Sequence, residues 1–130
     1  MQRLFHPTVK LTCLALWCLA WLGVAALLLA PLPSSGVQSD LLAHAVLFGA
    51  MALGAVSFCH HPGQLTLLTV ITIAVGTVLE FAQGLVPYRT FDLHDALANA
   101  LGAGAGYLAA LAILYSVVRP AASASASGRS

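Results

Sequence analysis

Side chains suited to acid–base chemistry recur at helical spacing along this sequence. Asp40 and His44 are four residues apart, and so are Asp95 and Asn99. Residues i and i+4 lie on the same face of a helix, so each pair predicts a polar stripe. On a third stretch, an arc of roughly 80° contains Thr69, Gly76, Glu80 and Gln83. Carboxylates and imidazoles can transfer protons or hold a polar ligand, so the three stripes form the candidate site.

Arg89 is the cation that lies in the chain between the stripe with Glu80 and Gln83 and the stripe with Asp95 and Asn99. Its guanidinium suits a bidentate contact with an oxyanion, so it can pair with the carboxylates or receive an anionic head group or phosphate. We therefore expect ligand-binding side chains at Asp40, His44, Glu80, Gln83, Arg89, Asp95 and Asn99. The candidates for acid–base catalysis among them are His44, Glu80 and Asp95.

Other polar residues have simpler interpretations. Asp92 begins a predicted helix, where its carboxylate can accept hydrogen bonds from free backbone N–H groups. His94 points away from the polar stripe of the same helix. The adjacent residues Cys59, His60 and His61 have poor geometry for chelation. The sequence therefore assigns no metal ligands and no cofactor.

Four apolar stretches must position the candidate side chains. Of the 130 residues, 60% are hydrophobic and 7% are charged, whereas a soluble domain carries about 25% charged residues. A helix needs about 20 apolar residues to cross a membrane. The pattern predicts an all-α membrane protein, a bundle of four transmembrane helices in a single domain over residues 1–120. The predicted helices span 9–30, 41–59, 64–83 and 92–118, and residues 121–130, rich in Ala and Ser, are expected to form a disordered tail.

Basic residues predict how the helices are oriented, because cytoplasmic loops carry an excess of Lys and Arg. With both termini in the cytoplasm, four of the five basic residues lie inside and Arg89 alone lies outside. Glu80 is then roughly 24 Å from the inner end of a hydrocarbon core about 30 Å thick. The acidic residues therefore gather near the extracytoplasmic surface. Basic residues before the first stretch also suit a signal peptide, but its apolar part exceeds the usual 7–15 residues, which favours a retained helix.

The last predicted helix also carries small residues at every fourth position, Ala98, Gly102, Gly106 and Ala110. Such a track lets two helices approach closely. We expect it to be a packing seam, and it also permits a homo-oligomer.

The order of these residues is similar to that of the VanZ-like family of small bacterial membrane proteins. The matching motifs are Asp40-Leu-Leu-Ala-His44, Glu80-Phe-Ala-Gln83, Val86-Pro87-Tyr88-Arg89, Asp95-Ala-Leu-Ala-Asn99 and Gly102-x-x-x-Gly106. They cover about residues 38–115. This chain departs from the family at Leu41, where a lysine is frequent, and at Tyr88, where a glycine is frequent, and the missing lysine removes one anion contact. The resemblance implies a multi-pass protein of the bacterial inner membrane, and the name-giving member of the family is associated with teicoplanin resistance.

Three functions fit these observations. The favoured one is a cell-envelope module whose extracytoplasmic polar cleft binds a lipid-linked precursor or a glycopeptide-like ligand among membrane lipids. The second is a membrane enzyme that acts on a lipid-linked substrate by acid–base chemistry, or with a divalent cation held by the clustered carboxylates. The third is a purely structural polar network. A net charge of +1 leaves no basic face for nucleic acid.

Overall fold

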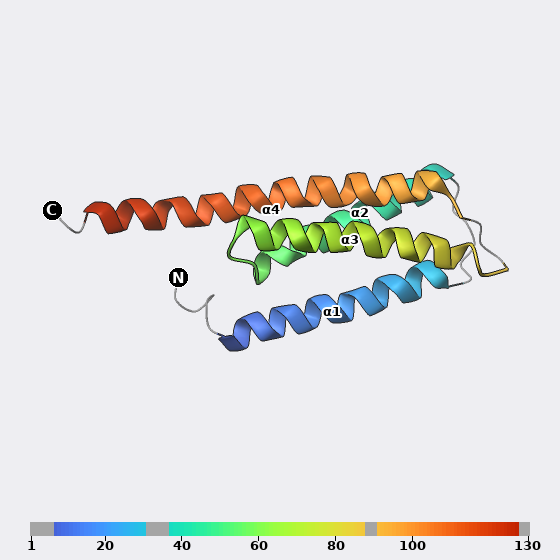
Figure 1. The fold of residues 1–130 in the computed structure, drawn as a ribbon, viewed down its shortest axis with the longest axis horizontal. Helices are drawn as coiled ribbons and strands as arrows, with labels where there is room; N and C mark the ends of the chain where they lie inside the picture. The colour runs from blue at the N-terminus through green and yellow to red at the C-terminus, as the bar shows by residue number, and fades with distance from the viewer. Residues whose placement is uncertain (1–6, 31–36, 88–90, 128–130) are drawn as a thin grey trace.

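The computed structural model describes the backbone of residues 7–30, 37–87 and 91–127, and the side chains of residues 7–30, 40–87 and 91–116. Within these residues the chain is helical and contains no strand (Figure 1). The elements are α1 (Pro7–Leu29), α2 (Val37–Gly54), the short 3₁₀ helix η2 (Ala55–Ser57), α3 (Pro62–Gln83) and α4 (Leu93–Ser127). The prediction of an all-α, four-helix protein is therefore confirmed.

Each long helix is apolar enough to cross a membrane. The candidate spans are Pro7–Leu29, Asp40–Ser57, Pro62–Gln83 and Leu93–Ser116. Large apolar side chains cover the outside of the bundle, including Leu101, which is 74% exposed, and Leu11, which is 66% exposed. A surface of this kind suits lipid rather than water, because soluble monomers rarely expose large apolar patches.

The observed helix boundaries differ from the predicted ones mainly at the end of α4. The sequence predicted that this helix ends at residue 118 and that a disordered tail follows, whereas the helix continues through Ser127. The structure thus differs from the expected tail over residues 121–127, which continue the helix. Alanine has the highest helix propensity, and adding residues to an existing helix is much easier than starting a new one.

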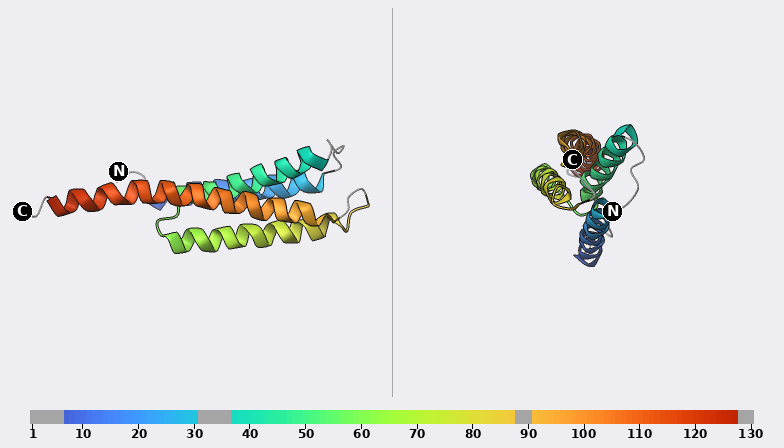
Figure 2. Two further views of the ribbon diagram at one scale, coloured as in Figure 1. Left: turned by 90° about the horizontal axis from the view of Figure 1, so that it is seen from above. Right: turned by 90° about the vertical axis from the view of Figure 1, so that its right-hand side faces the viewer.

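The bundle has two distinct ends. At the loop end, α1 leads to α2 and α3 leads to α4, whereas at the turn end η2 connects α2 to α3 (Figure 1). The start of α1 and the end of α4 both lie toward the turn end, as an even number of crossings requires. Figure 2 shows α2, α3 and α4 grouped together, with α1 on one side.

Helix α2 packs on α4 along a seam of small residues. A side-chain carbon added to Gly102 would overlap the carbonyl of Ala45, and one added to Gly106 would overlap the carbonyl of Gly49. The predicted small-residue track on α4 is buried along its whole length, which confirms it as a packing seam. Ala45 and Gly49, four residues apart on α2, provide the other half of the seam, which we did not predict.

Aromatic side chains attach α1 to this core. The Nε1 of Trp17 donates a hydrogen bond of 2.8 Å to the carbonyl of Met51. The ring of Trp21 meets the ring of Phe48 edge to face, with a centroid distance of 5.7 Å. Phe48 is fully buried and packs against Gly76 of α3, where a side-chain carbon would come within 2.6 Å of the ring. The residue one turn before Phe48 on α2 is His44, so this packing also determines where the candidate site lies.

Candidate functional site

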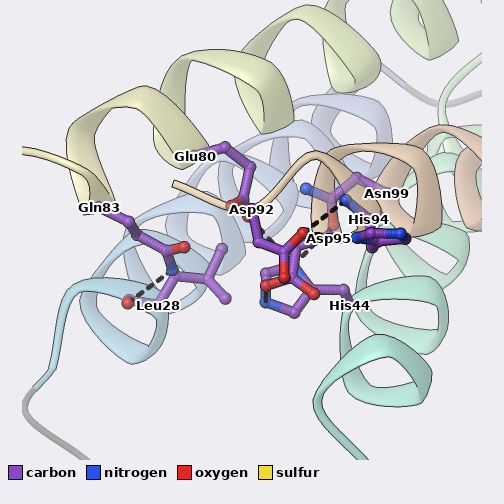
Figure 3. Close-up of polar contacts among 8 residues, drawn as sticks. All are labelled: Leu28, His44, Glu80, Gln83, Asp92, His94, Asp95 and Asn99. Carbon is purple, nitrogen blue, oxygen red and sulfur yellow. Dashed lines mark hydrogen bonds and ion pairs between the residues drawn. The ribbon is translucent and has the colours of Figure 1, made fainter. Parts of the chain in front are cut away.

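His44 is the centre of a buried polar cluster that draws on three helices. Its Nδ1 lies 3.0 Å from Oδ1 of Asn99 and 3.3 Å from Oε1 of Glu80. Its Nε2 lies 3.9 Å from Oδ2 of Asp95. We call these four residues, His44, Glu80, Asp95 and Asn99, the His44 cluster (Figure 3). The structure thus brings together four of the seven predicted ligand-binding residues, including all three catalytic candidates.

The helices position the cluster at the loop end of the bundle. His44 lies in the second turn of α2, Glu80 in the last turn of α3, and Asp95 and Asn99 in the first two turns of α4. The contact of Gly102 with Ala45 lies beside the cluster. Gly102 is about one helical turn after Asn99 on α4, and Ala45 directly follows His44 on α2. Close backbone approach at the seam therefore holds Asn99 against His44.

The cluster is almost completely withdrawn from the molecular surface. The exposed fraction is 0% for Glu80, 1% for Asn99 and 4% for His44, whereas the Asp95 side chain is 19% exposed. Asp95 is thus the member through which the cluster reaches the surface at the loop end.

The hydrogen bonds of the cluster are incomplete within the part of the chain that the structure describes. Neither carboxylate oxygen of Glu80 accepts a hydrogen bond there, and Nδ2 of Asn99 donates none. The 3.3 Å approach of Glu80 to His44 is an ion pair only when the imidazole is protonated. A buried polar group without a partner is expensive, and a carboxylate more so than an amide. The cluster therefore favours an additional cation or hydrogen-bond donor at Glu80.

Gln83 is buried near the cluster but has a different partner. Its Nε2 donates a hydrogen bond of 2.8 Å to the carbonyl of Leu28, and Figure 3 shows the two residues apart from His44. The last carbonyls of a helix have no partner within that helix. Gln83 thus fastens the end of α1 to the end of α3, a contact that the polar stripe on α3 did not reveal.

Two predicted site residues remain, Asp40 and Arg89. Asp40 is half-buried, one turn before His44 on α2, and it is not among the residues whose ligand atoms lie together in the cluster. Arg89 lies outside the described residues, so its proposed contacts with the carboxylates or with a ligand stay predictions.

Asp92 caps α4, as predicted. Its Oδ1 accepts a hydrogen bond of 2.8 Å from the backbone N–H of His94 and lies 2.9 Å from Nδ1 of the same residue. These hydrogen bonds favour the ionised carboxylate and hold the pKa of Asp92 below its ordinary value. The side chain of His94 is 77% exposed, in agreement with the prediction that it points away from the polar stripe.

The turn end has titratable residues but a different character. Cys59 is buried among Ala55, Leu65 and Ala110, and this burial raises the pKa of its thiol. The described polar cluster and the cysteine therefore lie at opposite ends of the bundle.

Comparison with known proteins places the chain in a family. The family model described as VanZ/LLP1 matches residues 40–115, a stretch that begins at Asp40 and contains every member of the His44 cluster. No curated protein and no solved structure matches the chain. Because the matched stretch covers more than half of the 130 residues and the helices are long and apolar enough to span a membrane, this chain is a multi-pass membrane protein of the VanZ/LLP1 family.

Proposed function

We propose that this protein is a ligand-binding module of the bacterial cell envelope, and that the His44 cluster receives the polar part of a lipid-linked or glycopeptide-like ligand. The observation that carries the proposal is the fully buried Glu80, whose two oxygens accept no hydrogen bond from the described residues. A ligand that donates hydrogen bonds or carries a cation would supply what the carboxylate lacks.

The side of the membrane follows from the charge distribution. With both termini in the cytoplasm, the positive-inside rule places the loop end outside. The His44 cluster would then open toward the outer leaflet through Asp95, which is the most exposed of its four members. A lipid-linked envelope precursor or a glycopeptide antibiotic would reach the cluster from that side, in line with the association of the family's name-giving member with teicoplanin resistance.

A purely structural role for the cluster is less favoured. A polar network that only locks helices together stabilises a bundle most when every polar group in it has a hydrogen-bond partner. A network with unpaired groups is less stabilising than an apolar core. The close α2–α4 seam and the apolar packing at the turn end already hold the helices together.

Direct binding measurements test the proposal. The full-length protein in nanodiscs is titrated with teicoplanin and, separately, with a polyprenyl-linked precursor, and binding is compared among wild type, His44→Gln and Asp92→Asn. We expect His44→Gln to weaken binding of one of the two ligands at least tenfold and Asp92→Asn, whose side chain lies outside the cluster, to bind like wild type. Equal binding by all three proteins, or no binding of either ligand by wild type, would reject the proposal.

The geometry also supports an enzymatic function as a second candidate. Both ring nitrogens of His44 face a carboxylate, at 3.3 Å for Glu80 and 3.9 Å for Asp95. A histidine held between two carboxylates is a suitable general base for a lipid-linked substrate. Turnover of polyprenyl phosphates or phospholipids by purified wild type, lost in His44→Gln, would favour this function, whereas unchanged lipid pools would count against it.

A further inference from the structure

Three members of the His44 cluster have the donor atoms of a metal site. One nitrogen of His44 and one carboxylate oxygen each from Glu80 and Asp95 all lie within 4.8 Å of one another. In a tetrahedral site with bonds of about 2.1 Å, neighbouring donor atoms are about 3.4 Å apart. The three side chains would therefore have to close by at most about 1.4 Å at their widest separation, which small changes in their side-chain torsions can supply.

The hydrogen bond to Asn99 prepares His44 for such a role. Oδ1 of Asn99 lies 3.0 Å from Nδ1, and a carbonyl oxygen can only accept, so the proton of the neutral ring is on Nδ1. Metal-binding histidines commonly donate their second ring N–H to an acceptor in this way, which orients the ring and increases its basicity. The lone pair is then on Nε2, the ring nitrogen that faces Asp95.

The arrangement around Nε2 and Glu80 is one that a cation stabilises. With its proton on Nδ1, the ring offers Asp95 no hydrogen across the 3.9 Å between Nε2 and Oδ2. Glu80 is fully buried, and within the described chain neither of its oxygens accepts a hydrogen bond. Ionised side chains inside a membrane bundle are expensive unless they are paired or bind an ion. A second proton on the imidazole would also stabilise the carboxylates. That proton would occupy Nε2, the nitrogen that the hydrogen bond to Asn99 leaves available as a metal ligand.

We infer that His44, Glu80 and Asp95 bind a divalent metal ion of the Zn²⁺ or Mn²⁺ type, with Asn99 holding the imidazole in position. One imidazole with two carboxylates suits these ions better than Ca²⁺ or Mg²⁺, which prefer oxygen ligands alone. Three protein ligands leave a coordination position open. The inference rests on the proposed function in that the metal uses the same cluster, and it adds that the ligand offers the ion an oxygen of a phosphate or carboxylate group.

Metal content of the purified full-length chain is the direct test. The protein in detergent is dialysed against micromolar ZnCl₂ or MnCl₂, passed through a desalting column and analysed for bound metal. We expect about one ion per wild-type chain, with at least tenfold weaker binding in Glu80→Gln and in Asp95→Asn. Asp92→Asn is the matched control, because it removes a carboxylate at the same end of the bundle from a side chain outside the cluster, and it should bind metal like wild type.

Two further measurements keep the test decisive. Cys59, His60 and His61 could hold zinc adventitiously at the turn end, so His61→Gln must retain the ion; loss of zinc in His61→Gln but not in Glu80→Gln would overturn the inference. If the cluster variants fail to fold, wild type alone decides: zinc or manganese must raise its melting temperature, because an ion that binds only the folded state stabilises it. No such rise and no stoichiometric metal would also overturn it.

The test of metal binding can fail or succeed independently of the test of the proposed function. Cluster-dependent binding of a lipid-linked ligand or glycopeptide by metal-free protein would leave the proposed function intact and remove the metal. Stoichiometric metal without binding of either ligand would do the opposite.

Discussion

The loop end and the turn end of the bundle use the same three helices in different ways. At the turn end, η2 and the turn that follows it meet α3 and α4 through a buried apolar cluster of Ala55, Cys59, Leu65 and Ala110, against which Leu53 of α2 packs. At the loop end, α2, α3 and α4 meet through the His44 cluster, in which a carboxylate and an amide are buried with incomplete hydrogen bonding among the described residues. The buried packing at the turn end is apolar, and the polar contact that joins α3 to α4 there, between the hydroxyls of Thr66 and Tyr107, is exposed.

This difference separates what holds the fold from what the site can do. The seam of α2 and α4 runs between the two ends and brings their backbones together at Gly102 and Gly106. Since the seam and the turn end supply the packing, the polar loop end is free to keep groups that destabilise the bundle on their own. Unsatisfied buried polar groups of this kind are characteristic of functional sites.

The largest expected effect is at the seam that both ends share. Gly106→Leu would force α2 away from α4, because even one added carbon overlaps the carbonyl of Gly49. We expect it to lower the free energy of unfolding by about 3 kcal/mol or more and to reduce the folded fraction in size-exclusion chromatography. Gly104→Ala is the control, since nothing lies within 4 Å of a carbon added there; similar losses in both variants would contradict the seam.

The next effect concerns the turn end. Leu65 is fully buried, so Leu65→Ala should lower the free energy of unfolding by about 2–5 kcal/mol through lost contacts and the cavity left behind. Leu67 is on the same helix but 61% exposed, and Leu67→Ala should change stability by less than about 0.5 kcal/mol. Both are measured by denaturant titration in detergent. If fully folded Leu65→Ala protein lost ligand binding, the turn end would contribute to binding and the distinction between the two ends would be wrong.

A smaller effect is expected where α1 joins the bundle. Gln83→Met keeps the side-chain length but leaves the carbonyl of Leu28 without the donor it has now, which costs about 1–3 kcal/mol. The chain has two tryptophans, both on α1, so tryptophan fluorescence during unfolding reports on this helix directly. We expect α1 to detach earlier in Gln83→Met, while metal binding by the His44 cluster is retained; unchanged fluorescence would show that the hydrogen bond is dispensable.

The smallest expected effect is that of the α4 cap, and it depends on pH. The pKa of Asp92 is lower in the folded protein, below its ordinary value of 3.8, chiefly because the backbone N–H of His94 donates to the carboxylate. The cap therefore contributes its full stability above pH 4 and loses it as the pH falls through the folded pKa. Asp92→Ala should lower the melting temperature slightly at pH 7 and by less at pH 3, whereas Asp92→Asn, which still caps, should change little at either pH. A larger loss at pH 3 than at pH 7 would contradict this assignment.

Much of this architecture follows from local sequence patterns. Runs of apolar residues predict the helices, because a membrane demands a minimum length, and the spacing of Asp95 with Asn99 and of Glu80 on α3 predicts which faces carry polar groups. The partner of Gln83 could not be predicted, because it depends on how α1 crosses α3, and the first stretch has no Asp, Glu, Lys, Arg or His between Leu11 and Ala30 to indicate this crossing. The sequence suggested a divalent cation held by the clustered carboxylates, but it did not show that His44 would lie within reach of Glu80 and Asp95. These donors come from three helices, and their distances depend on the close approach at the seam. Helix α4 outlasts its apolar stretch because alanine sustains a helix that hydropathy alone would end.

The most direct test of the account is Glu80→Gln, with stability and binding measured on one preparation. The amide has nearly the shape of the carboxylate and is cheaper to bury. We predict that the melting temperature of the metal-free protein stays the same or rises, while binding of zinc or manganese and of the envelope ligand falls at least tenfold. A fall in melting temperature as large as that of Leu65→Ala, with binding unchanged, would show that the loop end holds the fold in the same way as the turn end and would contradict the account.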